Sequence, residues 1–350
     1  MTDQPRKPKS EQLQATDEIV EDAPGVLRTQ LPANITGLGH VNMYVMEDER
    51  GVAVVDPGLP TKESWIALQD RLSRIGVPLK RVHTVIVTHS HPDHYGGAER
   101  IRAESGADLV THRLFRTFYD PTEPPDLDAE ELALMMRSPF DAPPWGGPAM
   151  DVPWQRRVRL RIGRTFPRLM RIPSPSIRLN ETDRMRFARR DWMAVHTPGH
   201  THDHLCLFDP ETGTLLSGDH VLPNITPHIS GLTAHGDPLT LFFDSLDKIG
   251  RFADRVDIAL PAHGTPFTNV GERVDQIKEH HQERLQKLCD TSEELGGPAS
   301  VMEFARHLFS PRAQGSMADS ETYAHLEHLR LLGRMQRREN DGVSEYVLID

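Results

Sequence analysis

The sequence predicts an α/β layered domain followed by a small α+β region. From about Gly25 to Phe267, short apolar segments typical of strands alternate with segments of helical spacing, which is the pattern of a layered α/β domain. After that point the chain changes to three helical segments and a closing hairpin. A chain of 350 residues, 37% hydrophobic and 26% charged, is long enough for one large domain and one small one.

The first half of the large domain has strand–helix–strand alternation. A helix is predicted over Lys62–Ile75, where the apolar residues Trp65, Ile66, Leu68 and Leu72 have helical spacing. A second helix follows Gly96-Gly97 and runs to about Ser105. The predicted strands are Val26–Leu31, His40–Glu47, Val52–Asp56, Val82–Thr88 and Asp108–Val110.

The second half of the domain repeats this pattern. A helix is predicted over Leu239–Ile249, between two groups of strands. The predicted strands are Ser176–Leu179, Met185–Phe187, Trp192–His196, His204–Phe208, Thr214–Ser217 and Val256–Leu260.

A long insertion, Leu114–Ser174, separates the two halves. It is rich in proline and arginine and holds a short predicted helix over Ala129–Arg137. An insertion of this length inside a compact domain is usually functional, such as a lid. Although the whole chain carries a net charge of −11, residues Asp151–Arg190 hold twelve arginines against three acidic residues. Seven of those arginines lie in Arg156–Arg171. Two interpretations stay open for them: a solvated, salt-bridged surface, or a clamp for phosphate or carboxylate.

The N-terminal segment and the cysteines bear on the environment of the protein. Met1–Asp22 is polar and has no apolar stretch of the kind found in secretory signals, so we expect a disordered lead. Cys206 and Cys289 lie far apart in unrelated contexts, which argues against a disulfide and favours the cytoplasm. The sequence contains no stretch of about 18 apolar residues, so no membrane span is predicted.

The C-terminal region, residues 271–350, is expected to be a separate winged-helix-like domain beside a main domain of residues 23–270. Its predicted hairpin turns at Asn340-Asp341-Gly342, a favoured hairpin sequence. The paired His280-His281 are expected to face solvent. The predicted helices and hairpin strands are Glu272–Asp290, Ser300–Leu308, Glu321–Arg334, Gly333–Arg338 and Val343–Ile349.

The residues that carry chemistry begin where the strand Val82–Thr88 ends. His89, His91, Asp93 and His94 place four potential ligands within six residues. On a loop rather than a helix face, such side chains can converge on a small volume. Imidazoles and carboxylates are ligands for zinc, iron or manganese. This run therefore predicts a metal site.

Three later residues complete the pattern. His200 lies in Pro198-Gly199-His200-Thr201, Asp219 in Ser217-Gly218-Asp219-His220, and His263 in Pro261-Ala262-His263-Gly264. Each follows a predicted strand, and loops after the strands of a layered sheet gather at one edge. Together, in this order, they indicate a metal centre built from four parts of the chain.

This ordered set resembles the metallo-β-lactamase superfamily, which implies an αβ/βα four-layer sandwich with metals at the sheet edge. The turn Val55-Asp56-Pro57-Gly58 matches a further superfamily element, whose aspartate supports the site. The resemblance implies two divalent ions, zinc above all, with iron or manganese as alternatives. It assigns His89, His91 and His200 to one metal, Asp93, His94 and His263 to the other, and Asp219 to both.

The branch within the superfamily is indicated by softer features. An aspartate at 219, where true zinc β-lactamases commonly have cysteine at a second-metal position, resembles glyoxalase II, lactonases and the ribonuclease branches. Ala324-His325-Leu326 and Leu332-Gly333-Arg334 resemble the β-lactamase-like group that includes a mitochondrial endoribonuclease.

The expected function is that of a dinuclear hydrolase. Two cations would share a water, lower its pKa and supply hydroxide for attack on an ester, thioester or lactone, and Asp93 is the expected proton-handling residue. The alternative is a metal-dependent endoribonuclease. A mononuclear-iron persulfide dioxygenase, which needs only His89, His200 and Asp219, is less favoured, and a non-enzymatic binding protein least of all.

Substrate contacts are expected from His228, Tyr95 and Asn224, which lie near the ligands in sequence. His202, His204 and His220 are expected to support the site rather than bind the metal. A small anionic substrate is favoured over nucleic acid, because the C-terminal helices have few basic residues. Glu303, Glu321 and Glu327 would oppose phosphate contact there. The C-terminal region is instead expected to act as a cap or in a homodimer.

Overall fold

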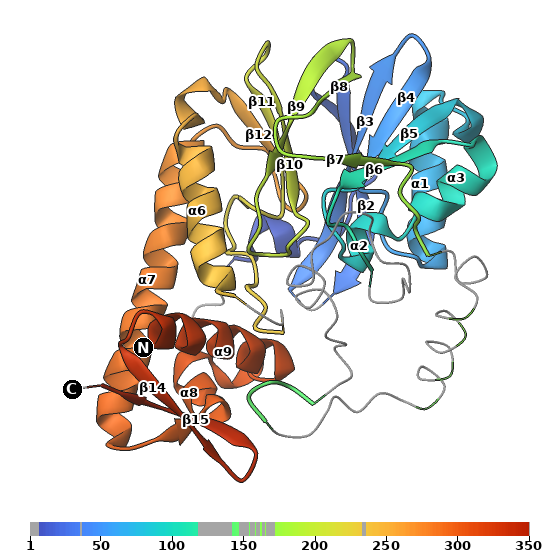
Figure 1. The fold of residues 1–350 in the computed structure, drawn as a ribbon. Helices are drawn as coiled ribbons and strands as arrows, with labels where there is room; N and C mark the ends of the chain where they lie inside the picture. Colours follow the sequence, from blue (N-terminus) through green and yellow to red (C-terminus); the bar gives the residue numbers. More distant parts are fainter. Residues whose placement is uncertain are drawn as a thin grey trace.

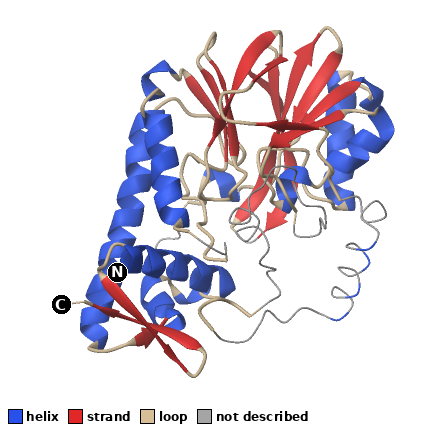
Figure 2. Ribbon diagram, in the orientation of Figure 1, coloured by secondary structure: helices blue, strands red, loops and turns tan. Residues whose placement is uncertain are grey.

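The main domain has four layers, in the order helices, sheet, sheet and helices (Figure 1). The structure is a computed structural model, and it describes residues 7–35, 37–117, 142–146, 172–232 and 236–349, with Trp154, Val158, Ile162 and Thr165. The predicted αβ/βα sandwich is confirmed. The two sheets lie face to face, with helices on their outer faces (Figure 2).

The first sheet contains seven strands in chain order among the described residues. Strands β1 to β4 are antiparallel neighbours, whereas β4 to β7 are mutually parallel. Helices α1 (Lys62–Ile75) and α3 (Ala98–Ser105) cover its outer face (Figure 1). The strands are β1 (Ile19–Ala23), β2 (Val26–Ile35), β3 (Leu38–Asp48), β4 (Gly51–Val55), β5 (Val82–Ile86), β6 (Asp108–His112) and β7 (Ile177–Leu179).

Both faces of this sheet are buried, and successive residues serve different cores. In β3, Met43 and Val45 pack with the helical layer, while Tyr44 and Met46 pack between the two sheets. This division follows from the period of two in side-chain direction along a strand. It explains why the central strands are almost continuously apolar.

The second sheet has the order β12-β11-β10-β9-β8. Because β10 is antiparallel to both β9 and β11, and β12 is parallel to β11, the strands β9, β11 and β12 all end at the same edge. Helices α6 (Pro238–Gly250) and α7 (Val270–Leu295) cover its outer face. The strands are β8 (Arg184–Phe187), β9 (Arg190–His196), β10 (Leu205–Asp209), β11 (Thr214–Gly218) and β12 (Ile258–Pro261).

The C-terminal region contains the three predicted helical segments and the hairpin. Helix α7 continues into this region and is followed by β13 (Ala299–Ser300), α8 (Val301–Leu308), α9 (Ser316–Leu331), β14 (Met335–Asn340) and β15 (Val343–Leu348). The hairpin turns at Asp341 and Gly342, whose φ angles of 50° and 75° are those of a type I′ turn.

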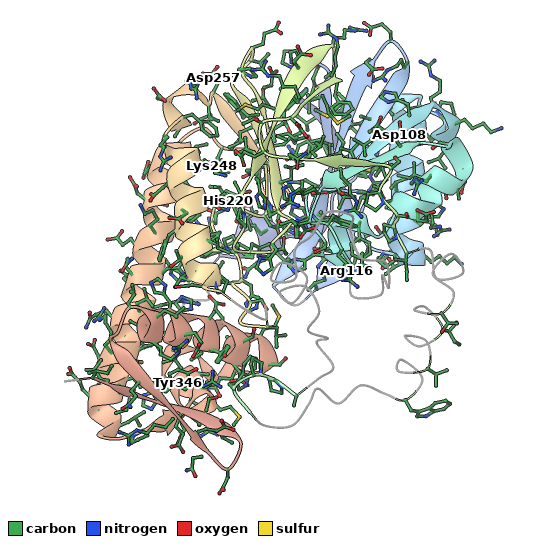
Figure 3. All side chains as sticks on the ribbon, in the orientation of Figure 1. Asp108, Arg116, His220, Lys248, Asp257 and Tyr346 are labelled. Carbon is green, nitrogen blue, oxygen red and sulfur yellow. The ribbon has the colours of Figure 1, made fainter. Side chains whose placement is uncertain are left out.

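This region shares its apolar core with the second sheet. Phe242 of α6, Leu288 of α7, Phe304 of α8 and Tyr346 of β15 belong to one buried cluster; Tyr346 is labelled in Figure 3. The predicted boundary at residue 270 coincides with the start of α7, but no break in packing occurs there. The C-terminal region is therefore packed against the second sheet, whose strands β9, β11 and β12 end at the same edge.

The prediction of a disordered N-terminal lead is wrong for residues 7–22; residues 1–6 lie outside the described part. Ser10–Gln12 forms a short 3-10 helix (η1), and β1 pairs with β2. Glu11 is fully buried, and one carboxylate oxygen accepts hydrogen bonds from the backbone N–H groups of Asn224 and Ile225, at 2.7 and 3.0 Å. Specific hydrogen bonds order this polar segment, which its composition does not reveal.

Other expectations are corrected or lie outside the described residues. His281 is buried rather than solvent-facing, because α7 is covered by α6 and α9 at that point. The last helix begins at Ser316 and ends at Leu331, earlier than predicted at both ends. The helical piece expected over Ala129–Arg137 and the arginines of Arg156–Arg171 lie outside the described residues. Among the residues described, no helix is long and apolar enough to cross a membrane.

Replacing Glu11 tests the role of the N-terminal segment. Glu11→Ala would leave two buried backbone N–H groups without an acceptor, and we expect a loss of about 1–3 kcal/mol in the free energy of unfolding. Urea unfolding followed by circular dichroism measures this change. The exposed Glu18 provides the control, since Glu18→Ala should change stability by less than about 0.5 kcal/mol. Equal stability of the two variants would contradict the assigned role.

Candidate metal centre

All seven predicted ligands come together at one edge of the sandwich. The run from His89 to His94 follows β5, and its last part forms the single-turn helix α2 (Pro92–Tyr95). His200 follows β9, Asp219 follows β11 and His263 follows β12. Since these strands end at a common edge, their loops meet across the two sheets.

One group of potential ligand atoms consists of His89, His91, His200 and Asp219. Their donor atoms lie within 4.8 Å of one another. His91 Nδ1 is 3.0 Å from His89 Nε2 and 3.1 Å from His200 Nε2. Asp219 Oδ2 is 3.5 Å from His200 Nε2 and 3.9 Å from His89 Nε2.

A second group lies directly beside the first and consists of Asp93, His94 and His263. Asp93 Oδ2 is 3.5 Å from the Nε2 atoms of both His94 and His263. Asp219 reaches this group as well, with Oδ2 3.6 Å from His94 Nε2 and Oδ1 3.4 Å from His263 Nε2. The Asp219 carboxylate therefore contacts both groups.

The chemistry of these atoms fits divalent cations. The Nε2 atoms of His94 and His263 and Oδ1 of Asp219 are buried, and none has a hydrogen-bond partner among the described residues. Buried polar atoms are rarely left unpaired without a ligand. Donor atoms bound at about 2.0–2.1 Å around a tetrahedral ion lie about 3.3 Å apart, close to the separations observed. Five imidazoles and two carboxylates suit zinc, iron or manganese.

Asp56 orients part of the site without belonging to either group. It stands at the end of β4 with a positive φ of 52°. One carboxylate oxygen accepts a hydrogen bond from the backbone N–H of Thr88 at 2.9 Å, and the other accepts from the Thr88 hydroxyl at 2.8 Å. His94 Nδ1 donates to this second oxygen at 2.9 Å, which leaves Nε2 facing the centre. The supporting role expected for this aspartate agrees with these contacts.

Backbone carbonyls orient two more ligands. His200 Nδ1 lies 2.7 Å from the carbonyl oxygen of His228, and His263 Nδ1 lies 2.6 Å from that of His40. Each carbonyl accepts the Nδ1–H and so directs Nε2 to the centre. The His40 ring is itself held by the carbonyl oxygen of Leu13, at 2.8 Å. His40 and Leu13 were not predicted from the sequence, because no motif marks a residue that acts through its backbone.

His204 holds the backbone of Asp219. Its Nε2 accepts the Asp219 N–H at 3.0 Å, and its Nδ1 lies 2.7 Å from the Thr197 hydroxyl. A Cβ at Gly218 would come within 2.5 Å of the His204 ring, so only glycine permits this approach. The ring of His220, the residue after Asp219, lies 5.1 Å from that of Phe242 in α6; His220 is labelled in Figure 3.

The electrostatics separate the two groups. Burial, together with repulsion from neighbouring histidines, lowers the pKa values of His89 and His91 well below the usual range, so both rings are neutral and keep lone pairs. Burial would also lower the pKa of His94, but Asp93, Asp219 and Asp56 outweigh it and raise that pKa. Burial would raise the pKa of Asp219, yet His263 and His94 hold it well below its usual range. The Asp219 carboxylate is therefore ionised.

The predicted substrate-contacting residues lie in three different environments. His228 contacts the centre through its backbone carbonyl, which accepts from His200, and its ring contacts Glu321 of α9. Tyr95 is buried in the core beneath α2, with its ring 6.1 Å from that of Phe115. Asn224 lies farther away, where its side chain and backbone bond Ser10 and Glu11 at a polar cavity of about 420 Å³.

A third group of potential ligands, His281, Glu321 and His325, lies buried between α7 and α9. His325 Nδ1 donates to the backbone carbonyl of Glu321 at 2.7 Å, and the rings of His281 and His325 are joined at 3.0 Å. Arg284 forms an ion pair with the Glu321 carboxylate, and its positive charge opposes a cation there. Glu321, which was expected to oppose phosphate contact, is buried in this network rather than on an exposed face. Glu327 is also largely covered and accepts from the Tyr346 hydroxyl.

Comparison with known proteins agrees with this geometry. The family profile of the metallo-beta-lactamase superfamily matches residues 36–263. A probable metallo-hydrolase of Bacillus subtilis (strain 168), YqjP, is 24% identical over 83% of this chain and 88% of its own. An atrochrysone carboxyl ACP thioesterase of Passalora fulva is 26% identical over 78% of this chain and 63% of its own. The crystal structure of a metallo-beta-lactamase family protein from Thermus thermophilus superposes with a TM-score of 0.71, at 28% identity, over 93% of this chain and 99% of that one.

Replacing Asp56 tests the support of the ligands. Asp56→Asn would place an amide N–H group against a donor from Thr88 or His94, and we expect metal affinity to fall about 10- to 100-fold. Competition with a fluorescent chelator measures the affinity, and elemental analysis gives the metal content. Asp70→Asn on the exposed side of α1 serves as the control and should bind metal like the wild type. Unchanged affinity in the Asp56 variant would refute its orienting role.

Proposed function

Because the chain belongs to the metallo-beta-lactamase superfamily, we propose that this metal-dependent hydrolase uses two metal ions to cleave an acyl bond, with a thioester as its first substrate class and esters and lactones as related ones. The observation that carries the proposal is the position of the Asp219 carboxylate. Its oxygens lie 3.4–3.9 Å from the ring nitrogens of four histidines, two in each group.

The second group of ligands supports two ions over one. A mononuclear iron enzyme would need only His89, His200 and Asp219. The other candidate ligands would then have no metal ion to bind. Here Asp93, His94 and His263 are buried, lie within 4.8 Å of one another, and carry two ring nitrogens without hydrogen-bond partners among the described residues. Their burial would be costly without a cation, since buried polar atoms lose their hydration.

The residues of the site have two proposed roles, holding the metal ions and accepting a proton. His89, His91 and His200 would hold one ion, Asp93, His94 and His263 the other, and Asp219 both. When bound, such a pair lowers the pKa of a shared water to near neutrality and stabilises negative charge on the substrate. Asp93 is the residue that we assign to the proton: its carboxylate lies at the second group, between His94 and His263, and can accept a proton from the attacking water.

The choice of a thioester rests on the curated relatives. The Passalora fulva protein is named as a thioesterase of an acyl carrier protein, although the match spans less than two thirds of its length. A thioester bond is activated toward attack at its carbonyl, and its thiolate leaves readily. An acyl substrate needs no large basic surface. The anion clamp proposed for Arg156–Arg171 lies outside the described residues and stays a prediction.

The C-terminal region is proposed to be a winged-helix-like unit that caps the site. In support, its described elements are three helices and a small sheet with the order β13-β15-β14. Its helix α9 reaches the loop after Asp219 through Glu321 and Ser320. A capping role suits this contact better than nucleic-acid binding, since this side of α9 is bonded to the loop that follows Asp219.

Metal content and two substitutions test the two-ion mechanism. We expect about two divalent ions per chain in the wild type. Asp219→Asn and His263→Ala should lose at least roughly 100-fold in kcat/KM, because each removes a ligand. Lys62→Ala at the start of α1 is the control and should retain full activity and both ions. Full activity in either ligand variant would exclude the mechanism.

A substrate panel tests the reaction class. With zinc, manganese or iron supplied separately, we expect turnover of short-chain acyl thioesters above that of lactones and simple esters. Single-stranded RNA at low salt is included in the panel, since a ribonuclease would show strongly salt-dependent cleavage. Cleavage of RNA without any thioester turnover would replace the present proposal. A persulfide with oxygen uptake as the readout tests the single-iron alternative.

A further inference from the structure

Helix α9 holds the loop that follows the metal ligand Asp219. The backbone N–H of Gly231 donates to the hydroxyl of Ser320 at 3.0 Å. The contact is so close that a Cβ at Gly231 would come within 2.5 Å of the Ser320 carbonyl oxygen. One residue farther along α9, Glu321 Oε2 lies 3.2 Å from His228 Nδ1. The loop from His228 to Gly231 is thus fastened to the C-terminal region.

The same His228 also borders the metal centre. Its backbone carbonyl accepts the Nδ1–H of His200 at 2.7 Å. The His228 side chain is 21% exposed. With Nδ1 bonded to Glu321, Nε2 is the ring nitrogen left for another partner.

Glu321 is itself rigidly placed. Its carboxylate is buried and paired with Arg284 of α7, and its backbone carbonyl accepts the Nδ1–H of His325. Burial alone would raise its pKa, but the hydrogen bond from His228 and the charge of Arg284 prevail and lower the pKa to about 2. An ionised carboxylate can only accept hydrogen bonds. His228 must therefore donate through Nδ1–H, and in the neutral ring Nε2 keeps its lone pair.

We propose that Glu321 is a positioning residue that fixes the tautomer and direction of His228. We further propose that His228 Nε2 accepts a hydrogen bond from an amide N–H in the thiol arm of the substrate. The inference rests on the proposed thioesterase function and narrows its substrate class. The substrates that fit are thioesters whose thiol arm carries an amide, as in acylated cysteamine derivatives. A dedicated acceptor of this kind discriminates, because a substrate without the N–H leaves it unpaired.

Two matched substrates test this selectivity in the full-length, metal-loaded protein. One is the acetyl thioester of N-acetylcysteamine, and the other is its analogue in which an ester oxygen replaces the amide N–H. For the wild type we expect kcat/KM to favour the amide by about fivefold or more, the effect of one hydrogen bond. In His228→Ala and Glu321→Ala the ratio should fall to about one. Glu321→Gln, which retains an acceptor oxygen, should restore part of it.

The matched control is Glu327→Ala. Glu327 is a second largely covered carboxylate on α9, bonded to Tyr346 and Arg330 rather than to the loop. Loss of this carboxylate perturbs the C-terminal region but should leave the substrate ratio at the wild-type value. If Glu321→Ala lowered turnover of both substrates equally, as Glu327→Ala would do through stability alone, the positioning role would be refuted.

A readout independent of turnover follows the tautomer directly. In ¹⁵N-histidine NMR spectra of the metal-loaded protein, assigned with the His228→Ala variant, we expect the His228 ring to carry its proton on Nδ1. In Glu321→Ala this signal should move toward a mixture of tautomers, with metal content unchanged. A proton on Nε2 in the wild type would overturn the inference. If the wild type cleaves no thioester, the proposed function fails, while the NMR result still decides whether Glu321 orients His228.

Discussion

The Asp219 carboxylate among four histidines is the interaction on which the rest of the structure depends. Buried and ionised, it is stabilised by His263 and His94 on one side, while its other neighbours are the rings of His200 and His89. A buried carboxylate is stable only when its charge is compensated. In the sandwich, β5, β9, β11 and β12 end at a common edge. The candidate ligands that follow these strands therefore lie close to one another.

The histidines can serve as ligands only if their rings are turned correctly, and the structure draws the necessary partners from distant parts of the chain. A β4 carboxylate, Asp56, orients His94. The carbonyls of His40 and His228 orient His263 and His200. The N-terminal segment holds His40 in turn, and α9 of the C-terminal region holds His228. Both terminal segments are therefore bonded to residues that orient the candidate ligands, and the C-terminal region also shares an apolar core with the second sheet.

Much of the fold could be predicted because the hydrophobic pattern has a local cause. The alternation in β3 and the helical spacing in α1 follow from the geometry of each element alone, and α1 begins and ends at the predicted residues. The predictions that fail concern polar residues. Glu11, His281 and Glu321 look like solvent-exposed residues in the sequence, yet each is buried and bonded to at least one partner more than 40 residues away. Nothing local distinguishes a buried, paired polar residue from an exposed one.

By itself, the sequence determined the layered α/β class and singled out the seven candidate ligands, because strand periodicity and a dense run of histidines and aspartates are properties of short segments. Only the tertiary structure decided that these ligands form two adjacent groups sharing Asp219, since that depends on strand order and on which strand ends meet. It also decided which residues turn the ligands toward the centre. Hydrogen bonds from carbonyls, and carboxylates brought from other elements, have no spacing along the chain that a sequence could show.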